Sequence, residues 1–276
     1  LEKDKYFFNA QFRYIRNDFP NGYEDRKSKL YLSGSDIPYS IFDHTVEKSN
    51  SPALDLYFQR NLSNGQQLIF NVVGTYIVTD NKRIYQEKLD NKMETDILSH
   101  IRGDKYSLIA EGIYEKKIGQ SKITAGLKHL QSYTDNEYSG NIVAEVSMKQ
   151  AESSVYAEYQ QKSGKWGYMV NVTASRIYFS QNDKHTEKYV LQPSLRIVFE
   201  PNDDLYFRYK INLQNNSPSL SAMNDIEQTI DAWLVRKGNP NLKAFNTLRQ
   251  NFTTGYSKGI FGVDLLVGYD YRSEER

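Results

Sequence analysis

The sequence predicts an all-β fold, an antiparallel up-and-down transmembrane β-barrel of which this chain supplies one portion. Apolar and polar residues alternate over segments of strand length, as expected for strands that have a different solvent on each face. The connections between these segments alternate between short and long. Tyrosine and phenylalanine are abundant, with 22 and 13 copies. Tyrosine suits both strand surfaces and membrane–water interfaces, because it joins an apolar ring to a hydroxyl group.

The segment 205–213 illustrates the alternation, since every odd-numbered residue in it is apolar or aromatic and every even-numbered one is amphipathic or polar. The predicted strands are 6–14, 53–60, 68–78, 105–118, 123–133, 154–161, 166–179, 189–199, 205–213, 248–256 and 261–271, with further strand character in 29–32 and 142–146. About eleven strands are therefore visible. A bacterial barrel closes with an even number, so we expect an incomplete barrel or one more strand.

The ends of the hairpins are unequal. Five connections are short: 61–65, 119–121, 163–165, 201–204 and 257–259. Those between them, such as 79–104, 134–150 and 181–188, are longer, a pattern typical of transmembrane barrels with periplasmic turns and extracellular loops. A soluble β-sandwich also alternates in polarity, but it has no reason to alternate its loop lengths. We therefore expect Phe207, Val170 and Val263 to face lipid and not the centre of two stacked layers.

Aromatic residues often end the apolar faces, as in Tyr106/Tyr114 and Trp166/Tyr178, which is the pattern of the aromatic girdles of a barrel.

Pro193 fits the predicted strand pattern less well than the other residues do. It lies in the middle of a predicted strand, and because a ladder tolerates proline mainly at edges and bulges, we expect a bulge there.

The long connection between 213 and 248 contains the candidate ligand site. Five apolar residues recur there at near-helical spacing, which predicts one short helix in a long loop: Leu220, Met223, Ile226, Ile230 and Trp233. Ser221 or Asn224 is the expected cap. The candidate ligand contacts are Trp233, Arg236, Asn239 and Asn241, because these residue types offer stacking and hydrogen bonding over a barrel mouth. The alternative, which we favour, is that the helix only packs the loop down.

Composition and motifs argue against catalysis, metals and nucleic acid. Lysine and arginine number 35 against 34 acidic residues and form no basic stripe, so no field would recruit nucleic acid. Cysteine is absent, and the four histidines are too scattered for a ligand set. Neither a calcium loop, nor a nucleophile elbow, nor a P-loop is present. We therefore expect no catalytic residue, no metal site and no cofactor.

Two motifs in the long loop resemble TonB-dependent outer-membrane receptors, and more closely the Bacteroidetes outer-membrane β-barrel group. They are Pro218-Ser-Leu-Ser221 and Arg236-Lys-Gly-Asn-Pro-Asn-Leu-Lys243, although Ala244-Phe245 departs from the Pro-Glu often found next. Shorter likenesses at 56–60, 79–85, 126–129 and 134–138 extend over nearly the whole chain.

The resemblance implies a barrel of about 22 strands in the bacterial outer membrane, of which 1–276 would be a single portion of about half. It implies further partners: the lipid bilayer and lipopolysaccharide, an N-terminal plug, the TonB system and a surface lipoprotein. It also implies energised uptake of a ligand such as a glycan, a peptide or a chelated metal. The chain begins at Leu1 without an initiator methionine, which also favours a piece of a longer protein.

Three other functions stay open at this stage. The chain could be a soluble β-sandwich or β-barrel binding module, in which the apolar faces form a core. It could be a structural or adhesion barrel of the outer membrane. An outer-membrane enzyme is the third alternative, and a hydrolytic activity that is lost on mutation of His129 would support it.

Overall fold

The computed structural model describes residues 2–3, 5–18, 22–34, 36–182 and 184–274. Its strands are β1 Glu2–Lys3, β2 Tyr6–Asn17, β3 Tyr23–Leu30, β4 Tyr39–Asn61, β5 Gln66–Leu89, β6 Lys92–Ile118, β7 Ser121–Gly140, β8 Ala144–Ser163, β9 Trp166–Gln181, β10 Lys184–Asn202, β11 Leu205–Asn216, β12 Gln228–Thr229, β13 Val235–Arg236, β14 Phe245–Lys258 and β15 Phe261–Glu274. The helix is α1, Leu220–Met223. In this described part of the chain, no helix is long and apolar enough to cross a membrane.

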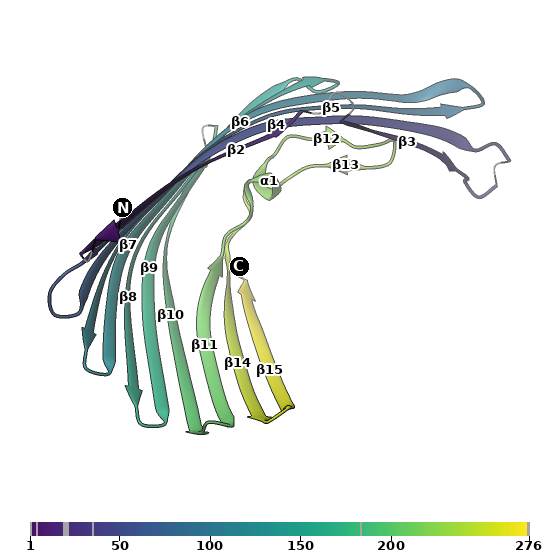
Figure 1. Ribbon diagram of the computed structural model, residues 1–276. Helices are drawn as coiled ribbons and strands as arrows, with labels where there is room; N and C mark the ends of the chain where they lie inside the picture. Colours follow the sequence, from purple (N-terminus) through teal and green to yellow (C-terminus); the bar gives the residue numbers. More distant parts are fainter. Residues whose placement is uncertain (1, 4, 19–21, 35, 183, 275–276) are drawn as a thin grey trace.

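The strands other than β12 and β13 form one curved antiparallel sheet, in the order β1-β2-β4-β5-β6-β7-β8-β9-β10-β11-β14-β15, with β3 paired to β4; β12 and β13 form a separate two-stranded sheet. Figure 1 shows that this sheet curls into an open trough and that the segment carrying α1, β12 and β13 crosses its concave side. The all-β, antiparallel, up-and-down fold class is thus confirmed.

The apolar residues lie on the exposed convex face of a single layer. Val170 is 45% exposed and Val263 52% exposed, whereas two stacked sheets would bury both. Phe207 is half-buried, but its ring stacks on Phe199 and Phe252 of neighbouring strands at 6.3 and 6.4 Å and not on a second layer. The prediction that the chain has no sandwich core is therefore correct.

Three predicted long connections are wrong, because they are strands. β5 and β6 pair through segment 79–104, with one register shift between Glu87 and Lys88, and turn at Asp90 and Asn91, whose φ angles of 48° and 62° suit a tight hairpin. Segments 134–150 and 181–188 likewise belong mostly to the pairs β7–β8 and β9–β10. Apolar alternation stops in these segments because strands that have left the lipid no longer need an apolar face toward it, while the backbone pairing continues.

The strand lengths support this explanation. β6 has 27 residues, which at ~3.4 Å per residue extend roughly 90 Å. A tilted strand needs only about 9–11 residues to cross a bilayer. More than half of β6 therefore projects beyond the membrane, as the long hairpins of Figure 1 illustrate.

The five short turns are confirmed, but the expected bulge at Pro193 is wrong. Pro193 pairs with Val172 in unbroken register with β9. On the other side, pairing between β10 and β11 begins only at Ser194, so Pro193 lies just beyond the end of that ladder, where a missing amide hydrogen costs least. The register shift of this pair lies between Phe199 and Asn202 instead.

Candidate functional site

The candidate site is formed by the segment 217–244, hereafter the inner loop, together with the concave face beneath it (Figure 1). Its predicted helix is only four residues long, Leu220–Met223, and its cap is Ser219, whose Oγ accepts a hydrogen bond from the amide of Ala222 at 3.2 Å. The rest of the expected helix is extended: β12 pairs with β13. Asn224 and Asp231 bond to nearby backbone amides, and such local bonds compete with a helix.

Gly238 allows the two arms of the inner loop to approach each other. Its amide donates to the carbonyl of Asn224 at 2.8 Å, and the next amide, of Asn239, donates to the carbonyl of Ala222 at 2.8 Å. A Cβ atom at position 238 would lie 2.3 Å from the carbonyl oxygen of Asn224. Only glycine fits this close backbone approach, which fixes the shape of the loop.

One end of the inner loop lies on strands β7 and β8. The Asn224 Nδ2 atom donates to the Tyr138 hydroxyl at 2.7 Å. Ile226 packs on the buried cluster formed by Tyr138, Val146 and Met148. Burial raises the pKa of Tyr138, because a charged phenolate is less stable away from water.

Asp225 extends the contact to the β9–β10 hairpin. Its Oδ1 accepts a hydrogen bond from Gln181 Nε2 at 2.6 Å, and its Oδ2 lies 4.0 Å from Lys184 Nζ. The inner loop therefore contacts strands that the sequence places far from it.

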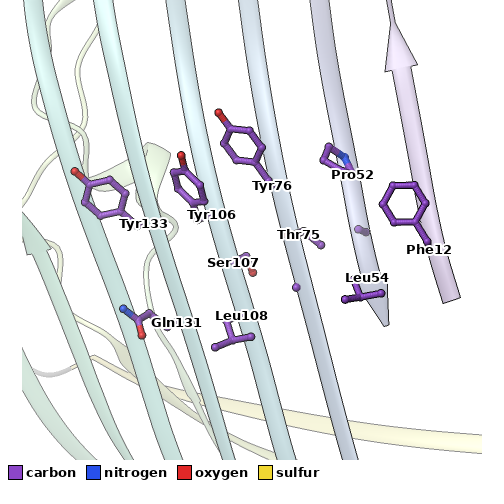
Figure 2. Close-up of a pocket in the computed structure, with 12 residues that line it drawn as sticks. Phe12, Pro52, Leu54, Thr75, Tyr76, Tyr106, Ser107, Leu108, Gln131 and Tyr133 are labelled. Carbon is purple, nitrogen blue, oxygen red and sulfur yellow. The ribbon is translucent and has the colours of Figure 1, made fainter. Parts of the chain in front are cut away.

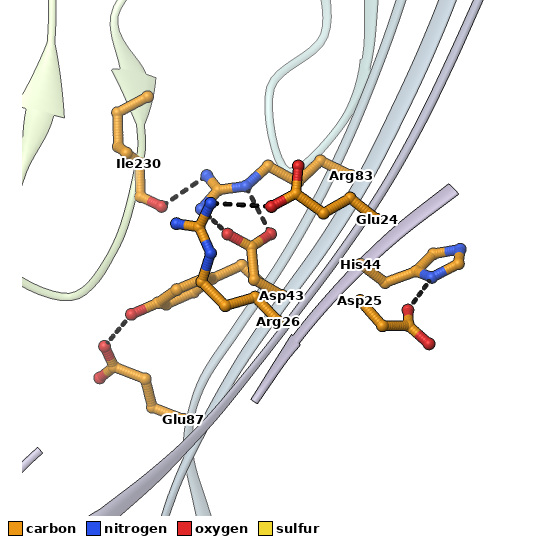
Figure 3. A network of polar contacts seen from close by, with 9 residues as sticks. Glu24, Asp25, Arg26, Asp43, His44, Arg83, Glu87 and Ile230 are labelled. Carbon is orange, nitrogen blue, oxygen red and sulfur yellow. Dashed lines mark hydrogen bonds and ion pairs between the residues drawn. The ribbon is translucent and has the colours of Figure 1, made fainter. Parts of the chain in front are cut away.

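The other end of the inner loop is held by Arg83 of β5 (Figure 3). Arg83 binds both carboxylate oxygens of Asp43 on β4, at 2.8 and 2.9 Å, and its Nη1 donates to the Ile230 carbonyl at 2.7 Å. Its guanidinium lies 4.9 Å from the centre of the Tyr85 ring. Asp43 raises the pKa of Arg83, so this anchor stays charged at any physiological pH.

Beside the anchor, a carboxylate is buried on the concave side. Glu87 is 1% exposed; it accepts a hydrogen bond from the Tyr85 hydroxyl and one from Thr95 Oγ1 at 3.3 Å. Burial, with Glu87 as the next cause, raises the pKa of Tyr85 well above its usual value. These bonds order the hairpin that carries Arg83.

The structure places the four predicted ligand contacts in different surroundings. Trp233 is 66% exposed and lies edge-on to Tyr39, with ring centres 6.5 Å apart. Asn239 accepts a hydrogen bond from the amide of Asn241 at 2.9 Å, so this pair forms a turn of the loop. Arg236 alone lines a cavity. The four residues do not converge on one point, and their contact with a ligand stays a prediction.

That cavity lies between the inner loop and the concave face and has a volume of about 580 Å³. Its lining is mostly polar: Lys105, Thr134, Asn136, Tyr138, Met148, Gln150, Ser219, Asn224, Ile226, Gln228, Arg236 and Gly238. Sequence reasoning missed the lining residues of β7 and β8, because they belonged to a predicted connection: Thr134, Asn136, Tyr138, Met148 and Gln150. A continued period of two in residues 134–138 was the signal that could have found them.

A second hollow, on the convex face, has a different character (Figure 2). It measures about 390 Å³ and is lined by apolar and aromatic residues of five neighbouring strands. Tyr76 and Tyr106 stack at 4.5 Å along its wall, and Gly74 leaves it open, since nothing lies within 4 Å of where a Cβ atom would be. At Gly112 the Phe70 ring fills the equivalent space at 3.4 Å. This hollow is a dent in the surface that faces lipid.

Comparison with known proteins gives the family. Residues 102–276, more than half of the chain, match the outer membrane protein beta-barrel family. No curated protein matches the sequence.

Solved structures give the fold. FpvAI, in its complex with pyocin S2, is similar with a TM-score of 0.54 and 10% identity over 97% of this chain and 44% of that one. The copper transporter OprC is similar with a TM-score of 0.53 and 9% identity over 96% of this chain and 49% of that one. This chain therefore spans about half the length of the structures it matches. From these findings, the chain belongs to the outer membrane protein beta-barrel family, and its place is the outer membrane.

Proposed function

We propose that this chain is part of the barrel of a TonB-dependent receptor that takes up a ligand across the outer membrane. One observation carries the proposal: the inner loop crosses the concave face and encloses a polar cavity against it. A barrel that only holds the membrane together gains nothing from a loop folded over its lumen. A receptor does, because such a loop can contact a ligand on its way into the barrel.

The polarity of the concave face supports passage of a hydrophilic ligand. Its residues in β5 to β8 include Thr79, Lys105, Asn136 and Gln150, and polar groups of this kind can hydrate a lumen or hold a plug. The likeness to the fold of OprC, which is a copper transporter, supports a wide barrel of this class.

An enzymatic function has less support. The Nδ1 atom of His129 lies 2.9 Å from Ser153 Oγ, but this pair is on the lipid-facing side of the sheet. A hydrolytic pair needs a third group that orients the imidazole and donors for an oxyanion. Among the described residues no carboxylate bonds to His129, so the contact is a cross-strand pair.

Growth experiments in the bacterium that encodes the full-length protein would test the proposal. We would compare strains with the intact gene, without it, and with segment 217–244 replaced by a flexible linker, on chelated metals, glycans and peptides as limiting nutrients. Transport predicts a growth defect on one nutrient class, shared by the linker strain and by a strain that lacks TonB. A defect of envelope integrity or adhesion, with normal growth on every nutrient, would refute it in favour of a structural barrel.

A further inference from the structure

We infer that the cavity under the inner loop binds a small, hydrophilic anion that carries carboxylate or phosphate groups. This inference rests on the proposed function, because it names the class of ligand that the receptor would take. The cavity volume of about 580 Å³ falls within the range of about 300–1,000 Å³ that is usual for sites of small molecules.

The charge of the cavity lining is one-sided. Lys105 and Arg236 line it, and no aspartate or glutamate does. The whole chain is almost balanced, with 35 basic and 34 acidic residues, so an excess of this sign does not follow from composition. Two cations without an anion in a partly enclosed space attract an anionic ligand.

Three neighbouring cations around the inner loop already have partners. Arg83 binds Asp43, Lys184 lies 4.0 Å from Asp225, and Lys237 lies 3.7 Å from Glu227. By contrast, neither Lys105 nor Arg236 forms an ion pair or a side-chain hydrogen bond with any residue in the described part of the chain. Both cations of the cavity lining therefore remain available for a ligand.

The two cations come from opposite walls of the cavity. Lys105 belongs to β6 of the sheet, and Arg236 belongs to β13 of the inner loop. An arginine binds carboxylate or phosphate through two parallel hydrogen bonds, and a lysine adds a compact charge. An anion bound to both would therefore hold the loop against the sheet, so that binding and loop closure are coupled.

The remaining lining suits hydroxyl and carbonyl groups on the same ligand. Asn136, Gln150 and Gln228 supply amides that can donate and accept. The Thr134 hydroxyl is buried and has no hydrogen-bond partner among the described residues, which leaves it free for a ligand group. Tyr138 and Met148 add apolar surface for the carbon skeleton.

Binding to the purified full-length protein in detergent would test this inference, with citrate and inorganic phosphate as anionic probes and glucitol as a neutral one. We expect citrate to bind by calorimetry, with an affinity that falls as salt rises, and to slow amide hydrogen exchange in 228–236. Lys105→Gln and Arg236→Gln should each lower the affinity for citrate at least tenfold. Lys237→Gln, which removes a neighbouring surface charge outside the lining, should leave affinity unchanged.

Three results would overturn the inference: no citrate or phosphate binding at millimolar concentration, equal binding of glucitol, or equal weakening by Lys237→Gln and Arg236→Gln. Each of these results can occur together with the TonB-dependent growth defect described above. In that case the proposal of transport is kept and the proposal that the ligand is an anion is rejected. Conversely, the purified protein could bind citrate through Lys105 and Arg236 while the deletion and linker strains show no transport defect. That result would support the anion site and refute the transport proposal.

Discussion

Replacing Arg83 with glutamine should release one end of the inner loop while the sheet stays folded. Arg83 and Asp43 both belong to the sheet, so the ion pair between them orients the guanidinium but does not itself hold the loop. The loop is held by the bond from Arg83 Nη1 to the Ile230 carbonyl, 2.7 Å long. Glutamine has no charge and is too short to replace that donor.

The size of the effect follows from this single bond. A hydrogen bond from a charged donor contributes about 1.5–3 kcal/mol, and we take about 2 kcal/mol because Arg83 is 25% exposed. Since 1.36 kcal/mol corresponds to a factor of ten, local opening should become about 30-fold more frequent. Asp43→Asn keeps the donor and loses only its orientation, so about 1 kcal/mol and a roughly fivefold rise are expected.

Hydrogen exchange followed by mass spectrometry on the full-length protein measures this opening directly. The amides of residues 228–236 should exchange faster, whereas those of 222–226 should change little, because Asn224 and Ile226 keep their contacts with Tyr138. Arg249→Gln, which removes another bidentate arginine pair with Asp270 between β14 and β15, is the matched control. An increase in the exchange rate of less than twofold in Arg83→Gln would refute the reasoning. So would a larger increase in Asp43→Asn than in Arg83→Gln.

Three further predictions concern backbone approach and the two faces of the sheet. Gly238→Ala should abolish exchange protection throughout the inner loop without unfolding the sheet, because its Cβ would lie 2.3 Å from a backbone oxygen; protected amides in the variant would contradict this. Gly126→Ala should lower stability by about 1–3 kcal/mol in denaturant titrations, because its Cβ would lie 2.3 Å from the Tyr156 ring. Val170→Lys should cost about 2–4 kcal/mol in bilayers and Asn171→Lys much less, which reversible unfolding from liposomes would measure; equal costs would mean that the two faces share one solvent.

The part of the fold that touches lipid was predictable, and the part that lies in water was not. In 205–213 the two faces meet different solvents, so the residues alternate and β11 could be assigned almost to the residue. In 79–104 neither face meets lipid, and Asp80, Asn81 and Lys82 look like a loop although each has a cross-strand partner. Alternation of apolar and polar residues shows that the two faces of a strand meet different surroundings. Backbone pairing does not depend on such a difference and can continue where it ends.

The candidate site was predictable only in location. The unusual length of the connection after 213 pointed to the inner loop, and Arg236 does line its cavity. The spacing of Ile226, Ile230 and Trp233 suggested a longer helix, but these residues do not share one buried face. Ile226 packs on the Tyr138 cluster, whereas Trp233 is 66% exposed. Contacts such as Arg83 with Ile230 join residues 147 positions apart, which no local pattern encodes.

The outer hairpin of β5 and β6 has a mechanical consequence. Apart from one register shift between Glu87 and Lys88, its ladder is unbroken from the turn at Asp90 and Asn91 down to the membrane, so the two strands are coupled along their length. Arg83 lies only seven positions from the tip, and it is the point where this hairpin meets the inner loop. A macromolecule that bound the tip of this hairpin would therefore act on the inner loop through Arg83 without entering the lumen.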